Sequence, residues 1–390
     1  MESTEELKTR ELLNEVSIPN YSTSTSTTFS NLLHDTISAI NHSLHSIPLN
    51  LLVTADVAPS FVKDIGADKV DFKFERPVSI EIGGSYTIHC IAKPDINVDL
   101  LVRLPKECFH EKDYLNHRYH AKRCLYLCII KKYLSSSPLI HKVEWSTLQN
   151  EARKPVLLVY PATKLVEAPG FFVRLIPTAT SLFSIQKLNL ERNNVRALNH
   201  GGISHPTPKY NSSILEDTFM EDTMDSIKKV FLGWKELGEA LILLKVWARQ
   251  RTSIYAHDCL NGFLLSVILS NLAYENKVNN SMKAMQIFRV TLNSIANPGF
   301  WTRGLCLKTK DKNAALKEMQ SKQHAAFNLA FRMTRVGCIQ LQEEAASTLQ
   351  CIEKCRDGGF EEIFMTRVDF PTKHDHCIRY KRTNIYKRAE

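Results

Sequence analysis

Residues 83–105 read GGSYTIHCIAKPDINVDLLVRLP, and this stretch decides the fold. A Gly84-Ser85 turn is followed by a strand-like run that carries Asp99. Side chains at i and i+2 of a strand point to the same face, so two acids at this spacing hold a pair of divalent ions together. The second position is Asp99, but the first is Asn97. The stretch therefore predicts a phosphoryl-transfer strand in which one metal ligand is an amide.

Turns and strands of this kind are typical of nucleotidyltransferases, whose two magnesium ions need three carboxylates. Asp95 shares the parity of Asp99, but four strand residues span ~13 Å, too far for both acids to bridge one ion pair. The third carboxylate is expected in Phe171–Pro177, which contains no acid and carries Arg174 instead. We therefore expect no metal, no cofactor and no catalysis at this site.

The composition is that of a globular protein with room for two or three domains. The chain has 390 residues and a net charge of +9, which favours polyanionic partners. Its ten cysteines contain no C-x-x-C pair, so a reducing intracellular compartment is expected. The charged start of the chain predicts no signal peptide, and no apolar run approaches the ~20 residues that span a bilayer. We expect a soluble protein without a membrane partner.

Patterning of the N-terminal half predicts a small α/β domain over residues 29–180. A short helix, Glu5–Val16, and a Ser/Thr linker, Tyr21–Thr28, form a segment 1–28 that we expect to be mobile. An amphipathic helix then covers residues 29–47. The domain's other expected elements are strands Val78–Ile82, Val98–Leu104, Pro155–Tyr160 and Phe171–Pro177 and a helix Lys112–Leu134.

The C-terminal half is predicted to be helical. A connector, residues 181–213, precedes a helical domain over 214–358, and the start of a further domain follows over 359–390. An apolar stripe extends from Ile227 to Leu244. The expected later elements are helices Leu260–Tyr274, Ser281–Ile295 and Ser321–Cys355, and strand-like runs Phe360–Met365 and Cys377–Tyr380.

Several motifs together resemble the Nrap family. They are VDLLVRLP (Val98–Pro105), DYLNHRYHAKRCLYL (Asp113–Leu127), LLKVWARQR (Leu243–Arg251), HDCLNGFLL (His257–Leu265) and GFEEIFMT (Gly359–Thr366). Members of this family show DINVD in the place of residues 95–99, so the resemblance implies that Asn97 is inherited. The resemblance implies an α+β fold: a degenerate nucleotidyltransferase α/β domain, then an all-α domain like that of poly(A) polymerase and oligoadenylate synthase. Family members are much longer, so the chain is expected to be a fragment or truncated isoform.

The resemblance also implies a function. The family acts as a non-catalytic scaffold of the small-subunit processome in the nucleolus, so the expected partners are pre-ribosomal or small nucleolar RNA and other processome proteins. Two alternatives stay open. One is an active RNA nucleotidyltransferase that uses Asp95 and Asp99, and the other is a protein-interaction module without RNA binding.

Basic side chains on the expected helix Lys112–Leu134 are candidates for phosphate contacts. A solvated helix face is an equally good interpretation of this charge run. Two arginines after Trp247 are further candidates, although packing by Trp247 with surface arginines is the favoured interpretation. The candidates are Lys112, Arg118, Lys122, Arg123, Lys131, Lys132, Arg249 and Arg251.

Cysteines and histidines near the C-terminus raise the question of zinc. The set is Cys351, Cys355, His374, His376 and Cys377. Cysteines four residues apart on an apolar helix are more often ordinary core residues, so no zinc site is expected.

Overall fold

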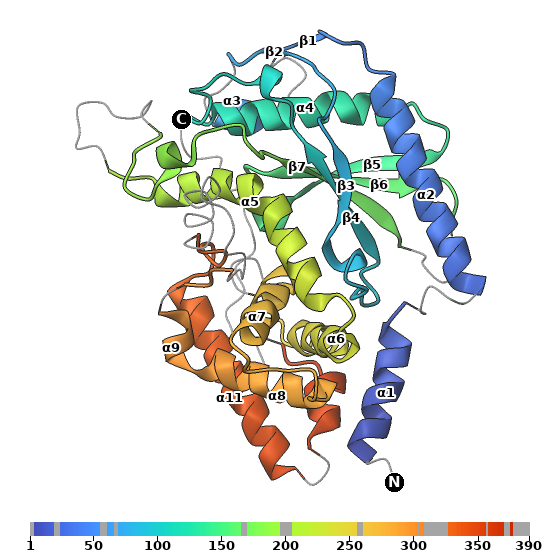
Figure 1. Cartoon of the computed structure of the whole chain (residues 1–390), viewed down its shortest axis with the longest axis vertical. Helices are drawn as coiled ribbons and strands as arrows, with labels where there is room; N and C mark the ends of the chain where they lie inside the picture. The colour runs from blue at the N-terminus through green and yellow to red at the C-terminus, as the bar shows by residue number, and fades with distance from the viewer. Residues whose placement is uncertain are drawn as a thin grey trace.

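A five-stranded mixed sheet forms the centre of the N-terminal half (Figure 1). Its order is β3-β4-β7-β6-β5, with β4 parallel to β7 and the other neighbours antiparallel. The central strands β4 and β7 are almost wholly buried, which explains why they read as continuous apolar runs. The strands are β3 (Ile80–Gly83), β4 (Asn97–Arg103), β5 (Ile140–Thr147), β6 (Pro155–Pro161) and β7 (Phe172–Thr178).

The computed structural model describes eleven segments of the chain, and all statements below concern them. Four of the five strands match the predicted strands to within two residues. The fifth, β5, was not predicted because this edge strand alternates single buried residues with exposed His, Lys and Glu. The segments are 4–18, 24–54, 61–65, 69–164, 170–195, 205–255, 260–302, 304–307, 327–355, 358–369 and 375–376.

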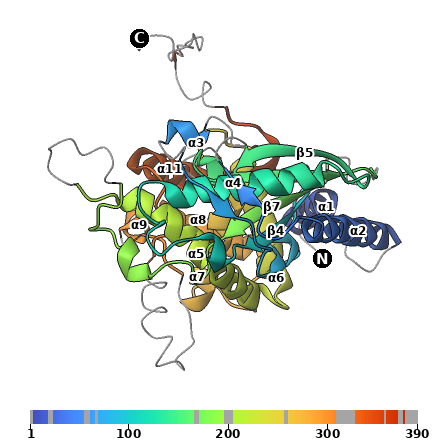
Figure 2. The ribbon, with the colours of Figure 1, turned by 90° about the horizontal axis from the view of Figure 1, so that it is seen from above.

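Helices α4 (Arg118–Leu134) and α2 (Ser24–His45) cover the sheet domain. Helix α4 packs on β5 and β6 and against α2. Seen from above, α1 (Thr4–Val16) and α2 project together from one side of the molecule (Figure 2). The remaining short elements here are β1 (Leu52–Val53), α3 (Phe61–Asp64), β2 (Phe72–Lys73) and four 3₁₀ turns at Gly84–Tyr86, Lys106–Cys108, Leu148–Asn150 and Ile185–Leu188.

The segment 1–28, which was predicted to be mobile, is largely helical where it is described. Helix α1 contacts α6, and its Glu5 pairs with Arg289 at 2.5 Å. Helix α2 begins at Ser24, inside the expected linker, because packing of the following apolar residues outweighs the weak helix preference of Ser and Thr. Residues 19–23 lie outside the described segments.

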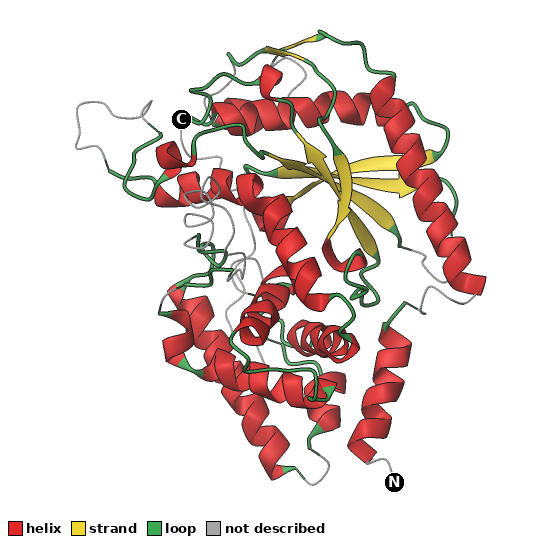
Figure 3. Cartoon of the chain, viewed as in Figure 1, coloured by secondary structure: helices red, strands yellow, loops and turns green. Residues whose placement is uncertain are grey.

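A long helix, α5 (Pro208–Phe231), connects the sheet to the helical half. Its first half is buried against β7, while its second half leads into the helices below (Figure 3). The predicted boundary at residue 213 therefore falls inside a continuous helix. The helix ends later, and Leu232–Trp234 form the turn to the next helix, in which Gly233 has a φ of +74°. The predicted apolar stripe is thus divided between two helices.

The helical half consists of α6 (Lys235–Arg249), α7 (Gly262–Tyr274), α8 (Ala284–Ala296), α9 (Pro298–Trp301) and α11 (Arg335–Lys354). Two predictions need correction here. Of the helix expected over Ser321–Cys355, residues 321–326 lie outside the described segments, residues 327–334 form turns, and helix α11 begins at Arg335. The strand-like run Phe360–Met365 is a π-helical turn, η6 (Glu361–Met365). The expected strand Cys377–Tyr380 lies outside the described residues.

One hydrophobic core extends through both halves. Trp247 on α6 is fully buried against Phe288 on α8, and its indole N–H donates to Thr348 Oγ1 on α11 at 2.9 Å. This packing fixes α6, the helix that faces the sheet. In the described part of the chain, every helix is too short or too polar to cross a bilayer.

Candidate functional site: a cavity between the sheet and α6

A cavity of about 480 Å³ lies between the ends of the central strands and helices α6 and α7. The sheet supplies one wall and the helical half supplies Lys245 and Arg249. All six residues that the sequence assigned to the nucleotidyltransferase-like site line this cavity: Gly84, Ser85, Asp95, Asn97, Asp99 and Arg174.

Gly84 begins the turn that closes the cavity floor, and the position requires glycine. Its φ is +69°, and an added Cβ would lie 2.3 Å from Oδ2 of Asp99. The backbone therefore approaches the Asp99 carboxylate as closely as contact permits.

Asp99 is buried, and its carboxylate is bonded to neighbouring side chains. In the sheet, Asp99 lies opposite Arg174 of the parallel strand β7. Oδ1 of Asp99 accepts from Nε of Arg174 at 2.8 Å and from Nδ2 of Asn97 at 3.1 Å. Burial lowers the pKa of Arg174, but the Asp99 carboxylate outweighs it and the pKa is raised overall. Arg174 is thus a permanent cation beside Asp99, on the strand where the third carboxylate was expected.

Asp95 points to the helical half rather than to Asp99. Its Oδ2 lies 2.9 Å from Nη2 of Arg249, and the same guanidinium donates to the carbonyls of Ala92 and Lys93. The Asp95–Arg249 pair therefore joins the loop before β4 to α6.

Lys245 is the site residue that sequence reasoning did not assign. Its buried ammonium donates to Ser85 Oγ at 2.8 Å and to the Cys90 carbonyl at 2.6 Å. The signal was present in LLKVWARQR, because Lys245 lies one turn before Arg249 on the same helix face. A cation inside an apolar helix indicates a buried partner.

Burial lowers the pKa of Lys245 from its ordinary value of 10.5 to about 8. Between pH 8 and 10.5 the unfolded chain keeps this proton, whereas the folded protein has lost it. The contribution of Lys245 to the free energy of unfolding therefore rises with pH over this range. At about 1.4 kcal/mol per pKa unit, the wild type should gain about 2–3 kcal/mol over Lys245→Met between pH 7 and 10. Urea unfolding of both proteins at the two pH values measures this gain.

The matched control is Lys229→Met, which removes an exposed lysine of α5. Its difference from the wild type should not change over the same pH range. A Lys245→Met difference that is equally flat would show that the ammonium is not held in a desolvated place.

The predicted RNA-binding cations divide into exposed and buried groups. Lys122 and Arg123 are buried, with Lys122 paired to Asp113 at 2.7 Å and Arg123 to Asp217 at 2.9 Å. The prediction that they contact RNA is therefore wrong, because each is paired with a buried acid. The other candidate cations on α4 and in the turn before it are accessible: Lys112, Arg118 and Lys132 are exposed, and Lys131 is half-buried.

Arg251 is also buried, contrary to its interpretation as a surface arginine. It donates to the carbonyls of Trp247 and Ile363 at 3.0 Å and pairs with Glu344. It holds η6 against the end of α6 and is not available to RNA.

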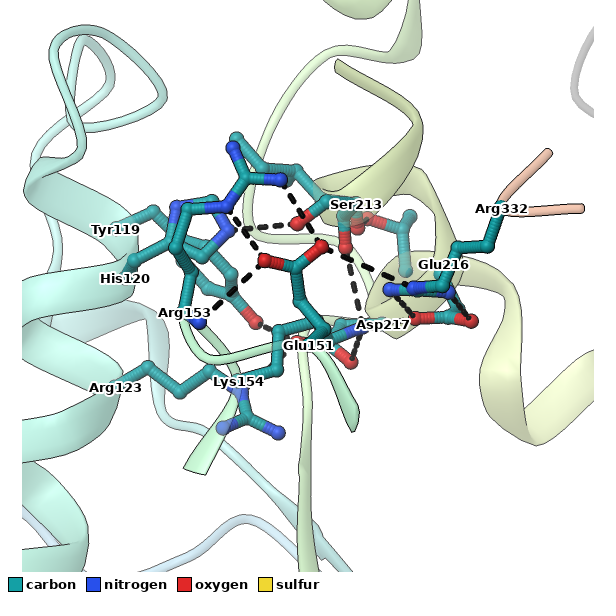
Figure 4. A network of polar contacts seen from close by, with 12 residues as sticks. Tyr119, His120, Arg123, Glu151, Arg153, Lys154, Ser213, Glu216, Asp217 and Arg332 are labelled. Atoms are coloured by element: carbon teal, nitrogen blue, oxygen red, sulfur yellow. Dashed lines mark hydrogen bonds and ion pairs between the residues drawn. The ribbon is translucent and has the colours of Figure 1, made fainter. Parts of the chain in front are cut away.

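A buried network of charges lies between α4, the β5–β6 connection and α5 (Figure 4). Asp217 accepts from Tyr119 Oη at 2.7 Å and from Arg123 Nε at 2.9 Å, and its second oxygen lies 2.6 Å from Lys154 Nζ. Glu216, the next residue, pairs with Lys154 and with Arg332. The network thus joins the sheet domain to residues 327–334 of the helical half.

His120 belongs to the same network and is neutral. Its Nε2 lies 2.7 Å from Oγ of Ser213. Burial and nearby cations lower its pKa well below the ordinary value. The Ser213–His120 contact is fully enclosed, so it positions α4 on α5 and cannot reach a substrate.

These observations define a class: a nucleotidyltransferase-like α/β domain joined to a helical domain, with the strand that carries Asn97 and Asp99 facing the cavity between them. Family comparison is consistent with this. The model described as Nrap protein domain 1 matches residues 38–232, and the model described as Nrap protein PAP/OAS-like domain matches residues 236–367. The chain belongs to the Nrap family. The boundary between the two matches coincides with the break between α5 and α6.

Curated relatives include the proteins named Nucleolar protein 6. The chain is 31% identical to that of Xenopus laevis over 336 residues, covering 82% of this chain and 29% of the relative. It is 30% identical to that of Homo sapiens, covering 80% and 28%, and 27% identical to that of Drosophila melanogaster, covering 79% and 27%. The chain therefore spans less than a third of the length of these relatives.

Solved structures with a similar course of the chain include the Cid1 poly(U) polymerase and the CdnC protein of E. coli MS115-1. The Cid1 structure has a TM-score of 0.47 at 10% identity and covers 93% of this chain and 98% of its own. CdnC has a TM-score of 0.45 at 11% identity, with the same coverage. At these scores neither structure bears on the chemistry of the present chain.

Proposed function

We propose that this chain is a non-catalytic scaffold of the nucleolar small-subunit processome that contributes to pre-ribosomal RNA processing through contacts with RNA and with other processome proteins. One observation carries the non-catalytic part of this proposal. The guanidinium of Arg174 is bonded to Asp99, the one acid in the position of a metal ligand.

Charge explains why this arrangement disfavours paired magnesium ions. Among the described residues that line the cavity, two aspartates face three cations: Arg174, Lys245 and Arg249. Two divalent ions need an excess of negative oxygen ligands, and here Asp99 is already bonded to a cation. A cavity with surplus positive charge instead favours phosphate groups.

The alternative of an active enzyme has little support in the geometry. It requires Asp95 and Asp99 to hold metal together, but Asp95 is paired with Arg249 and Asp99 with Arg174. Both ion pairs would have to break before an ion could enter. The cost of leaving the two guanidinium groups unpaired opposes that step.

The cellular part of the proposal is supported by the family. Relatives that match most of this chain are named as nucleolar proteins, so nucleolar localisation in the nucleus follows for this chain as a member. The processome, its RNA and its proteins are proposed partners, because the chain spans only part of those relatives.

The RNA-binding part is tested with the exposed cations of the α4 region. We expect the triple variant Lys112→Gln, Arg118→Gln and Lys132→Gln to bind single-stranded RNA more weakly than the wild type. If each cation neutralises one phosphate, the slope of log affinity against log salt should fall in magnitude by about 2. Filter binding across a salt series measures both values.

A matched control removes three exposed lysines from another face: Lys228→Gln, Lys229→Gln and Lys235→Gln. It lowers the net charge by the same amount, so a specific role for the α4 region predicts a smaller loss in the control. Equal losses would assign binding to net charge alone. A wild type whose binding is absent or independent of salt would favour the alternative of a protein-interaction module.

A further inference from the structure

The C-terminal end of α11 places two thiols side by side. Cys351 lies in the last turn, and Cys355 is the residue that ends the helix, with an extended backbone (φ −84°, ψ 139°). Their sulfur atoms are 3.7 Å apart, and both residues are half-buried rather than enclosed in the core. Cys351 packs against the hydrophobic core, as the sequence interpretation expects, but neither cysteine is fully enclosed there.

The chain beyond α11 turns back over these thiols. Gly358 and Gly359 have φ values of +72° and +66°, which glycine adopts without strain. An added Cβ on Gly359 would lie 2.4 Å from the Cys351 sulfur, so the backbone can approach the thiol this closely only at a glycine. The reversal places a carboxylate oxygen of Glu362 within 4.8 Å of both sulfur atoms.

The spacing of these atoms is that of a tetrahedral metal site. Zinc–sulfur bonds of about 2.3 Å at tetrahedral angles separate two sulfurs by about 3.8 Å. The observed 3.7 Å meets this without movement of the thiols. Thiolate ligands select zinc over magnesium or calcium, which prefer oxygen alone. We propose that Cys351, Cys355 and Glu362 bind a zinc ion, with a water molecule as the fourth ligand.

A second cysteine pair shows that a spacing of four residues does not by itself indicate a metal site. Cys124 and Cys128 are also four residues apart on a helix, but Cys124 is fully buried in the core of α4. In the part of the chain that the structure describes, Cys351, Cys355 and Glu362 are the one group of at least three such side chains with ligand atoms this close. Of the other residues considered for zinc from the sequence, His374 and Cys377 lie outside the described residues, and His376 is described and exposed but is not part of this group.

Bound zinc would tie α11 to η6. Both thiols bind as thiolates, so their protons pass to the solvent, and no electrons are transferred. Next to Glu362, Ile363 and Phe364 are buried, and their carbonyls accept from Arg251 and Gln250 at the end of α6. An ion at this point therefore links three segments of the helical half. Metal that binds only the folded state should raise the melting temperature.

The test uses the full chain, reduced and freed of metal, titrated with Co²⁺ as an optical probe and with Zn²⁺ as competitor. We expect one equivalent of Co²⁺ with a thiolate charge-transfer band, displacement by Zn²⁺, and a higher melting temperature with Zn²⁺. Cys351→Ser and Cys355→Ser should each weaken binding at least about tenfold, and Glu362→Gln should weaken it less but measurably. The matched control is Cys338→Ser, which changes a half-buried cysteine at the other end of α11 and should bind as the wild type does.

Three results would overturn the proposal. The first is a reduced wild type that binds no metal, including the case in which Cys351 and Cys355 form a disulfide in air and nothing else. The second is binding that the two cysteine variants retain in full. The third is a Glu362→Gln protein, exposed at this position and expected to fold, that binds as tightly as the wild type.

Discussion

Replacement of Asp217 by asparagine is expected to lower the free energy of unfolding by about 3–5 kcal/mol, the usual cost of removing one partner of a buried ion pair. The carboxylate is fully buried and is contacted by Arg123, Lys154 and Tyr119. An amide there would remove the acid that pairs with Arg123 and would leave Lys154 with Glu216, which is already paired with Arg332. The amide would also direct a donor at groups that are themselves donors.

Urea unfolding followed by circular dichroism measures this loss. The matched control is Glu144→Gln, which breaks an exposed pair with Lys142 on β5 and should change the midpoint little. If Asp217→Asn were as stable as the control, the buried network would not be what holds α5 between the two halves of the molecule.

The second large effect is expected from Trp247→Ala, which should cost about 3–5 kcal/mol because it opens a large cavity in the core. Trp247 is fully buried, its ring packs edge-on against Phe288, and its indole N–H is bonded to Thr348. Deletion of the ring removes the contact that holds α6 on α8 and α11. Because α6 also carries Lys245 and Arg249, the cavity wall should loosen with it.

Trp145→Ala is the control for this prediction, since Trp145 lies on the edge strand β5 and is 38% exposed. Thermal unfolding should show a much smaller shift for Trp145→Ala than for Trp247→Ala. Equal shifts would contradict the central position of Trp247 in the core.

The candidate site was predictable because its signal is local. Strand parity placed Asn97 and Asp99 on one face. The neighbouring strand, Phe171–Pro177, has no acid, and its one charged residue is Arg174. The register then sets Asp99 opposite Arg174, so the ion pair follows from two short segments. The fold class was predicted from the family motifs together with these strand and helix patterns, and the sheet followed by the helical half confirms it.

The basic helix could not be interpreted from its own sequence. Arg123 pairs with Asp217, 94 residues later, and periodicity along α4 carries no information about such a partner. A run of basic residues looks the same in the sequence whether its side chains face solvent or a buried acid. Lys245 posed the same difficulty, because its bond to Ser85 spans 160 residues. The sequence shows that these residues are charged, but it does not show which of them are exposed and which are buried.

The central claim is that the cavity between the sheet and α6 no longer supports nucleotide transfer. The most direct measurement incubates the chain with labelled nucleoside triphosphates, an RNA primer and Mg²⁺ or Mn²⁺, and follows primer extension. With Arg174 bonded to Asp99, we predict no incorporation above a reaction without protein. Incorporation by the wild type that disappears in Asp99→Ala would contradict the account.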